Sequence, residues 1–324
     1  MDEKLEDKKL KGKILVVDDQ EMSVTFLSRI LEKYGYSTVT AYDGIQALDK
    51  FNKERPDIIL LDIMMPNMNG FDVCKTIKDD PNNRMIPIIM ITALSDSEDK
   101  IRAIDCGADD FINKPFDKLE LLARINSLLR IKHLNDQLEN AENILFSMAR
   151  ILELKDPFTK GHIDRTTELA VKLGKHIDLS KEELDNLRKG AMLHDIGKIV
   201  IPDSILSKYE NLTEAETEIV KKHPVLGYEI CKPMISLKET LPVIRSHHER
   251  IDGTGYPDGL KGEEIPLIAR IMSVADNYDS LVYHKSYSLG VPASEAIMHL
   301  ISDADRNILD RKVVEKLIDI IKEQ

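Results

Sequence analysis

Histidine and aspartate side chains that could hold divalent metal ions recur through the second half of the chain. The adjacent pair His194 and Asp195 lies in the stretch Ala-Met-Leu-His-Asp-Ile-Gly-Lys at residues 191–198. Imidazole nitrogen suits borderline cations, and a carboxylate can bridge two of them. Five more candidates are spread along the sequence: His162, His223, His247, His248 and Asp276. Together they indicate a distributed metal site.

A lone histidine is more often an ordinary core or surface residue than a metal ligand. Four histidines are interpreted as such ordinary residues: His133, His176, His284 and His299. The other five fit this interpretation poorly. His194–Asp195 is followed by Gly197 and Lys198, and the doublet His247–His248 runs into the glycine-rich stretch Asp-Gly-Thr-Gly-Tyr-Pro at residues 252–257. Packing offers no reason for a double histidine before such a turn, so the pattern favours metal binding.

These motifs together resemble the HD-GYP family, a branch of the HD metal-dependent phosphohydrolases, over about residues 143–322. The resemblance implies two divalent transition metals, iron or manganese, bridged by Asp195. It implies that His162, His194 and Asp276 complete one metal and that His223, His247 and His248 complete the other. Such metals would lower the pKa of a water enough for attack on phosphorus near neutral pH.

Further residues of the same stretches are assigned to catalysis or substrate binding. Lys198, one helical turn beyond His194, is given a catalytic role with Asp195 and could reach a phosphate oxygen; the alternative is a solvated helix end. Arg270 could hold a phosphate or pair with an acid, and the sequence leaves both roles open. The remaining substrate-binding assignments form one loop: Gly253, Gly255, Tyr256 and Pro257. Its glycines permit close backbone approach to a ligand, although an ordinary surface turn uses the same residue types.

The chain departs from the family pattern at two places. Some members carry a glutamate four residues before the first histidine, which supports a third metal, whereas this chain has Phe158 there. Two metals are therefore expected, and the sequence leaves a third open. Near the C-terminus, Asn-Ile-Leu-Asp-Arg-Lys at residues 307–312 lacks the Gly and the Phe-Asp-Pro common in the family, so packing or regulation at that edge can differ.

Polar residues also follow short apolar runs in the first half of the chain. The runs at 14–17, 38–41, 58–61, 87–91 and 109–112 alternate with helical patterns at 21–34, 43–53, 70–79 and 96–106. This alternation predicts a doubly wound α/β domain, a parallel sheet covered by helices on both faces. Its strand ends would gather Asp18, Asp19, Asp62, Thr92 and Lys114 at one edge.

Carboxylates packed at one edge repel one another, so they need a cation, and their hard oxygens favour Mg²⁺. Asp62 could then act as a nucleophile toward phosphorus, with Mg²⁺ and Lys114 neutralising the added charge. The alternative, in which Asp18 and Asp19 merely cap a loop, leaves the matching residues at the other strand ends unexplained.

Residues 12–130 resemble the flavodoxin-like receiver domain of two-component response regulators. The resemblance implies a sensor histidine kinase as partner and gives these residues their roles: Asp18 and Asp19 as the acidic pair, Asp62 as phosphoacceptor, Thr92 as switch hydroxyl, Phe111 as aromatic switch residue and Lys114 before Pro115. It also leads us to expect a cis bond between Lys114 and Pro115, which proline alone allows cheaply.

One long helix is predicted from Asp117 to about Leu154, because this stretch contains neither proline nor glycine. Apolar residues recur along it at steps of three and four: Ile131, Leu134, Leu138, Ala141, Leu145, Met148 and Leu152. This heptad spacing fits two explanations. The seam could join two chains in a parallel homodimer, or it could pack on the core of its own domain.

Beyond the connector, the sequence predicts an all-α domain. Helical patterns occupy 161–176, 180–195, 214–222, 239–248, 265–282, 293–302 and 311–322, and Thr213 with Glu216 indicates a capping box. The predicted domains are therefore a charged tail at 1–12, a receiver domain at 13–130, a helical connector at 131–154 and an HD-GYP domain at 155–324.

Length and charge agree with a two-domain signalling enzyme. At 324 residues the chain exceeds the usual size of one domain, and its net charge of −12 argues against a DNA-binding output. The three cysteines lack CxxC spacing, as in a reducing compartment. The sequence also lacks an apolar run of membrane-spanning length and a signal peptide, so a cytoplasmic protein without membrane contact is expected.

The two resemblances imply a response regulator that hydrolyses cyclic di-GMP to pGpG, and on to GMP, under the control of Asp62 phosphorylation. The residues by themselves indicate only metal-assisted hydrolysis of a phosphoester. Two alternatives are a hydrolase that prefers pGpG or another cyclic dinucleotide, and a non-catalytic signalling module. Whether phosphorylation activates or inhibits is not encoded in any motif.

Overall fold

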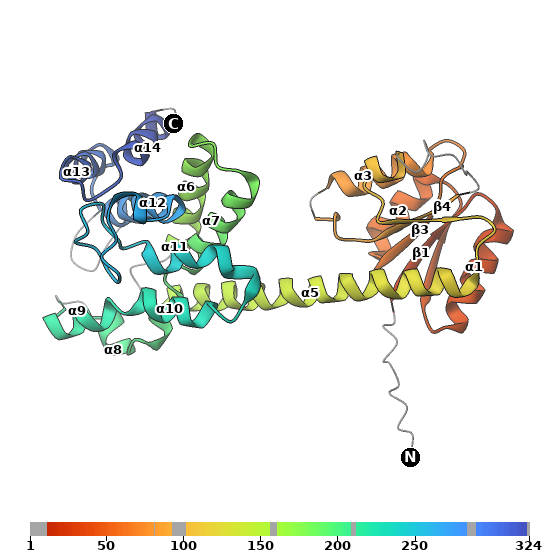
Figure 1. Cartoon of the computed structure of the whole chain (residues 1–324), viewed down its shortest axis with the longest axis horizontal. Helices are drawn as coiled ribbons and strands as arrows, with labels where there is room; N and C mark the ends of the chain where they lie inside the picture. The colour runs from red at the N-terminus through yellow and green to blue at the C-terminus, as the bar shows by residue number, and fades with distance from the viewer. Residues whose placement is uncertain are drawn as a thin grey trace, which may run out of the picture. The chain divides into compact units, whose positions relative to one another are not determined.

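The computed structural model describes residues 12–80, 82–92, 102–155, 161–208, 212–283 and 290–322 (Figure 1). By its internal contacts the chain divides into two compact units, Met1–Asn140 and Ala141–Gln324, which are described separately. Most of the predicted charged tail, the first part of the predicted helix at 96–106, Phe158 and His284 lie outside the described residues.

The first unit contains a five-stranded parallel sheet in the order β2-β1-β3-β4-β5. Its strands are β1 (Lys13–Val17), β2 (Ser37–Ala41), β3 (Ile58–Asp62), β4 (Ile88–Thr92) and β5 (Asp110–Asn113), and its helices include α1 (Glu21–Lys33), α2 (Gly44–Glu54) and α3 (Gly70–Asp79). The predicted doubly wound α/β fold is therefore confirmed.

Both faces of this sheet are buried, which explains the continuous apolar runs of its central strands. Successive residues of a strand point to opposite faces. Accordingly, Leu15 packs in one core cluster with Phe51 of α2, whereas Ile14 packs in another with Leu27 of α1. The sheet is thus held from both sides, and its strand ends are left to carry the polar residues.

A single helix, α5 (Lys118–Lys155), spans 38 residues and confirms the predicted long connector (Figure 1). Its apolar residues have two environments. Leu145 packs against a core cluster of the second unit and Leu152 is 8% exposed, so this part of the predicted seam lies on its own domain. By contrast, Leu134 is 55% exposed and Leu138 is 44% exposed.

The described residues of the second unit form helices and no strand, which confirms the all-α prediction. These are α6 (His162–His176), α7 (Lys181–Leu193), η1 (Ile196–Val200), α8 (Asp203–Leu206), α9 (Glu214–Val220), α10 (His223–Cys231), η2 (Ile235–Thr240), α11 (Leu241–Ser246), η3 (Gly262–Glu264), α12 (Leu267–Val282), α13 (Ala293–Asp305) and α14 (Arg311–Lys322). The predicted capping box of Thr213 and Glu216 is present at the start of α9.

Several predicted helix boundaries were wrong. The helix expected at 180–195 ends at Leu193, and the one expected at 239–248 is the short helix α11 preceded by a 3-10 turn. Helix α10 was missed, although Pro224 in its first turn is a residue that favours helix starts. These differences matter because the helix ends carry the candidate ligands.

Among the described residues, no helix combines the length and apolar character that crossing a membrane requires.

Candidate metal centre and phosphoacceptor site

Seven side chains that the sequence assigns to metal lie at helix ends or within a helix of the second unit. His162 begins α6, His194 follows α7, Asp195 precedes η1, His223 begins α10, His247 and His248 follow α11, and Asp276 lies within α12. The structure brings all seven into one site. We describe them as a first ligand group (His162, His194 and Asp276), a second ligand group (His223, His247 and His248) and the shared Asp195.

In the first ligand group, the nitrogen and oxygen atoms lie within contact distance of one another. His162 Nε2 is 3.3 Å from Asp276 Oδ1 and 3.4 Å from His194 Nε2. The aspartate side chain is 13% exposed and that of His194 is 1% exposed, so the group is almost closed to solvent.

In the second ligand group, His223 Nε2 lies 3.2 Å from His247 Nε2. Nitrogen atoms of His223, His247 and His248 and an oxygen of Asp195 all fall within 4.8 Å of one another. Three imidazoles and a carboxylate at this separation can surround one cation.

Asp195 faces both groups with different oxygens. Its Oδ2 lies 3.4 Å from His194 Nε2, and its Oδ1 lies 3.2 Å from His223 Nε2. A carboxylate in this orientation is suited to bridge two cations, one held by each group.

Backbone carbonyls orient three of the imidazoles. His194 Nδ1 lies 2.8 Å from the carbonyl oxygen of Ala191, and His223 Nδ1 lies 2.7 Å from that of Val220. Likewise, His247 Nδ1 lies 3.0 Å from the carbonyl oxygen of Ile244, three residues earlier in the chain. A carbonyl only accepts, so each Nδ1 carries a proton and the Nε2 of each ring is the nitrogen directed to the site, where it could bind a metal.

The charges of the site suit divalent cations. Burial lowers the pKa of His194 and of His247, and it lowers the pKa of His248 to about 3, so all three rings are neutral near pH 7. Burial opposes ionisation of Asp195, but the ammonium of Lys198 and the neighbouring histidines hold its pKa well below the usual value. Lone pairs that face one another beside a carboxylate repel unless a cation lies between them, so the donor set fits metal.

His162 differs from the other histidines because an aspartate orients it. Its Nδ1 lies 2.7 Å from Asp279 Oδ2, and Arg165 donates from Nε to the other oxygen of that aspartate at 2.6 Å. Burial lowers the pKa of His162, but the hydrogen bonds with Asp276 and Asp279 outweigh it and raise the pKa to about 10. A divalent cation would displace the Nε2 proton, because a ligand imidazole must be neutral.

Asp279 and Arg165 were missed at the sequence level. Asp279 lies one helical turn beyond Asp276 on α12, and Arg165 lies one turn beyond His162 on α6. That spacing is a signal that could have identified both, since ligands are commonly oriented by a carboxylate behind them.

Gly197 allows the turn that carries Asp195 to approach α10. A Cβ atom at Gly197 would lie 2.0 Å from the carbonyl oxygen of His223 and 2.5 Å from the backbone nitrogen of Gly227. Both obstacles are backbone and cannot rotate away. The glycine of the His-Asp-x-Gly-Lys motif therefore allows the two ligand groups to lie close together.

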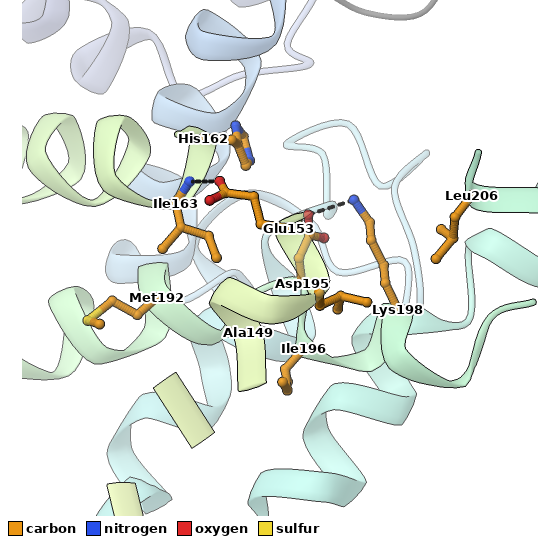
Figure 2. A pocket seen from close by; sticks show the side chains of 10 residues that line it. Ala149, Glu153, His162, Ile163, Met192, Asp195, Ile196, Lys198 and Leu206 are labelled. Atoms are coloured by element: carbon orange, nitrogen blue, oxygen red, sulfur yellow. Dashed lines mark hydrogen bonds and ion pairs between the residues drawn. The ribbon is translucent and has the colours of Figure 1, made fainter. Parts of the chain in front are cut away.

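Lys198 points toward the shared aspartate, as Figure 2 shows. Its Nζ lies 2.6 Å from Asp195 Oδ2, and its side chain is 22% exposed. It lines a pocket together with Asp195 and His162. Lys198 therefore lies beside the candidate ligands rather than on a solvated helix end.

The loop that contains Gly253, Gly255, Tyr256 and Pro257 is held by a buried carboxylate that the sequence did not single out. Glu249 is 3% exposed and accepts hydrogen bonds from three backbone N–H groups at residues 258–260. At Gly255 a Cβ would lie 2.5 Å from the Cα of Glu249. The missing side chain therefore lets the loop lie close to the protein's own backbone. The ring of Tyr256 stacks on His248 with centroids 4.8 Å apart.

Arg270 takes the acid-pairing role that the sequence left open. Its Nη1 lies 2.5 Å from Asp310 Oδ2, and its Nε donates to the carbonyl oxygen of Ile265 at 2.9 Å. The guanidinium thus joins the start of α12 to the segment before α14. This arrangement favours a structural role for Arg270 over a phosphate contact.

In the first unit, the candidate phosphoacceptor site forms at the carboxyl edge of the sheet. Lys114 Nζ donates to Asp18 Oδ2 at 2.7 Å and to Asp62 Oδ1 at 2.6 Å. Burial raises the pKa of Asp62, and the hydrogen bond from Lys114 opposes this only in part. Burial favours the neutral form of Lys114, but its two carboxylate partners raise its pKa.

The other receiver residues take the expected positions along the same edge. Asp19 is exposed next to the buried Asp18, and Thr92 is the last residue of β4. Phe111 lies in β5 and packs at the margin of a core cluster. The Lys114–Pro115 bond is cis, as expected. The oxygen-rich arrangement of Asp18, Asp19 and Asp62 is of a kind that Mg²⁺ prefers.

Comparisons with known proteins assign a family to each unit. A family model described as response regulator receiver domain matches residues 14–126, and one described as HD domain matches residues 147–313. These two matches together account for most of the chain.

Several curated proteins resemble the chain over nearly its full length. It is 34% identical to the cyclic di-GMP phosphodiesterase response regulator RpfG of Xanthomonas campestris pv. campestris, over 94% of this chain and 86% of that protein. It is 32% identical to a cyclic di-GMP phosphodiesterase of Thermotoga maritima, over 96% of this chain and 90% of that protein. A probable cyclic di-GMP phosphodiesterase of Vibrio cholerae is 34% identical, over 95% of this chain and 79% of that protein.

Proposed function

Because the chain belongs to the response regulators in which a receiver domain precedes an HD phosphohydrolase domain, we propose that it hydrolyses cyclic di-GMP in a metal-dependent reaction. The single observation that carries this proposal is the position of Asp195, whose two oxygens face two different groups of histidines. The substrate is taken from the names of the relatives, which are cyclic di-GMP phosphodiesterases.

The first ligand group would hold one metal ion and the second ligand group the other, with Asp195 in contact with both. Two such ions, iron or manganese, would supply a nucleophile from water and neutralise charge on the phosphodiester. Lys198 provides a further positive charge beside Asp195. We assign it to a non-bridging phosphate oxygen, which it could contact as a point charge.

Water attack on one phosphodiester of the cyclic dinucleotide would break a single P–O bond and give linear pGpG. A second hydrolysis would give GMP. The loop with Gly253, Gly255, Tyr256 and Pro257 lies against His248 through the Tyr256 ring. We therefore propose that this loop supports the second ligand group and borders the bound nucleotide.

The receiver unit would control this activity. We assign phosphorylation by a sensor histidine kinase to Asp62, with Mg²⁺ held by Asp18, Asp19 and Asp62. Lys114, which already joins Asp18 and Asp62, would neutralise the added phosphoryl charge. Thr92 and Phe111 are assigned to the accompanying switch.

A homodimer would use the exposed apolar stripe of α5. The stripe runs through Ile131, Leu134, Leu138, Ala141, Ile144, Met148 and Ile151, and its large members are 44–59% exposed. It departs from the predicted seam, since Ile144 and Ile151 replace Leu145, which packs against a core cluster, and Leu152, which is buried. Apolar side chains at steps of three and four on an exposed helix suit pairing with the same helix of a second copy.

Hydrolysis of cyclic di-GMP tests the proposed activity. The purified full chain, loaded anaerobically with Fe²⁺ or Mn²⁺, is expected to form pGpG, as followed by chromatography. The His194→Ala/Asp195→Ala double variant should lose this turnover, because it removes a first-group ligand and the shared carboxylate. His299→Ala, an exposed histidine, is the matched control. If neither metal supports turnover, with or without a phosphodonor, the proposed activity is wrong. The protein would then act on another nucleotide or serve as a binding module.

Labelling by acetyl phosphate tests the phosphoacceptor. Asp62→Asn should abolish incorporation of phosphate while leaving basal hydrolysis in place, because the substitution lies in the other unit from the metal centre. Asp49→Asn, on the exposed side of α2, should be labelled as the wild type is. Label retained in Asp62→Asn would place the acceptor at another residue.

Sedimentation tests the dimer. Leu134→Lys combined with Leu138→Lys should convert the protein to a monomer, because charges would replace apolar contacts across the pairing surface. Glu139→Lys combined with Asn143→Lys is the control, with two exposed residues on a different face of the same helix. A dimer that persists in the leucine variant would contradict this role of α5.

A further inference from the structure

The last turns of α5 form one wall of the pocket beside the first ligand group. Ala149, Leu152 and Glu153 line it together with His162, Asp195 and Lys198 (Figure 2). The cavity holds about 20 Å³, room for about one water molecule. This wall therefore supports the site rather than enclosing a nucleotide.

Packing ties α5 to the chain neighbours of two ligands. Ala149 is buried in the same cluster as Ile163 and Ile196, and Leu152, which is also buried, lines the pocket beside them. Ile163 directly follows His162, and Ile196 directly follows Asp195. A close-packed core transmits displacement between its members, so the position of α5 bears on both ligands.

Glu153 adds a polar link at the start of α6. Its Oε1 accepts a hydrogen bond from the backbone N–H of Ile163 at 2.7 Å, drawn as a dashed line in Figure 2. The first N–H groups of a helix have no partner within that helix. The capping residue of α6 is Gly161, which has no side chain to supply one. A carboxylate from another helix fills this need and is also favoured by the positive end of the helix dipole.

We propose that Glu153 is a positioning residue through which α5 fixes His162 and thereby sets the metal affinity of the first ligand group. The inference rests on the proposed function to the extent that it treats His162 as a ligand. His223 and His247 are oriented by carbonyls of their own segments. The second ligand group is therefore expected to keep its affinity when Glu153 is altered.

The test is binding of Mn²⁺ to the full chain, measured by equilibrium dialysis without any substrate. Glu153→Ala should weaken one of two Mn²⁺ sites by about 10- to 100-fold, the range typical for residues that orient ligands, and leave the other site unchanged. Glu153→Gln should restore binding, because its amide oxygen can accept the same N–H. Leu154→Ala is the matched control, since this neighbour is 73% exposed.

Two results would overturn the inference. One is a Glu153→Ala protein that binds two Mn²⁺ with wild-type affinity. The other is a Glu153→Gln protein that binds Mn²⁺ as weakly as Glu153→Ala. That result would show that the hydrogen bond from the Ile163 N–H does not set the metal affinity. Circular dichroism of each variant checks that the fold is kept. A wild-type chain that binds two Mn²⁺ but does not hydrolyse cyclic di-GMP would contradict the proposed substrate and leave this inference standing.

Discussion

The second unit depends on one electrostatic constraint, the enclosure of several neutral imidazoles around the ionised carboxylate of Asp195. Burial keeps the rings of His194, His247 and His248 neutral, while Lys198 and the histidines keep Asp195 charged. Such an array is unfavourable unless a cation completes it. The helix ends, the close contact at Gly197 and the carbonyls behind the rings all act to hold it in place.

The fold and the set of candidate ligands could be predicted because their signals are local. Alternating apolar runs and helical patterns indicate the parallel sheet, and the His-Asp pair and the double histidine stand out as motifs. The partners of those motifs could not be predicted in the same way. Asp279 lies 117 residues from His162, and Glu153 reaches Ile163 from another helix. Short helices such as α10 have too few turns for periodicity to reveal them.

The connector shows how burial divides a single apolar pattern. The heptad spacing predicted one seam, but the second unit takes Leu145 and Leu152 into its own core and leaves Ile144 and Ile151 exposed. Periodicity alone could not make this distinction, because adjacent positions are both apolar. One face of α5 thus packs beside the candidate ligands, while another face stays exposed at residues such as Leu134 and Leu138.

The central claim is that Asp195 is shared by two metal ions, and elemental analysis of the Asp195→Ala protein tests it most directly. Removing a shared ligand should lower the occupancy of both sites, so the variant is expected to retain well under the wild-type metal content. Asp203→Ala, with an exposed side chain on α8, should retain the wild-type content. Full occupancy in Asp195→Ala would contradict the account, because it would show that neither group depends on this carboxylate.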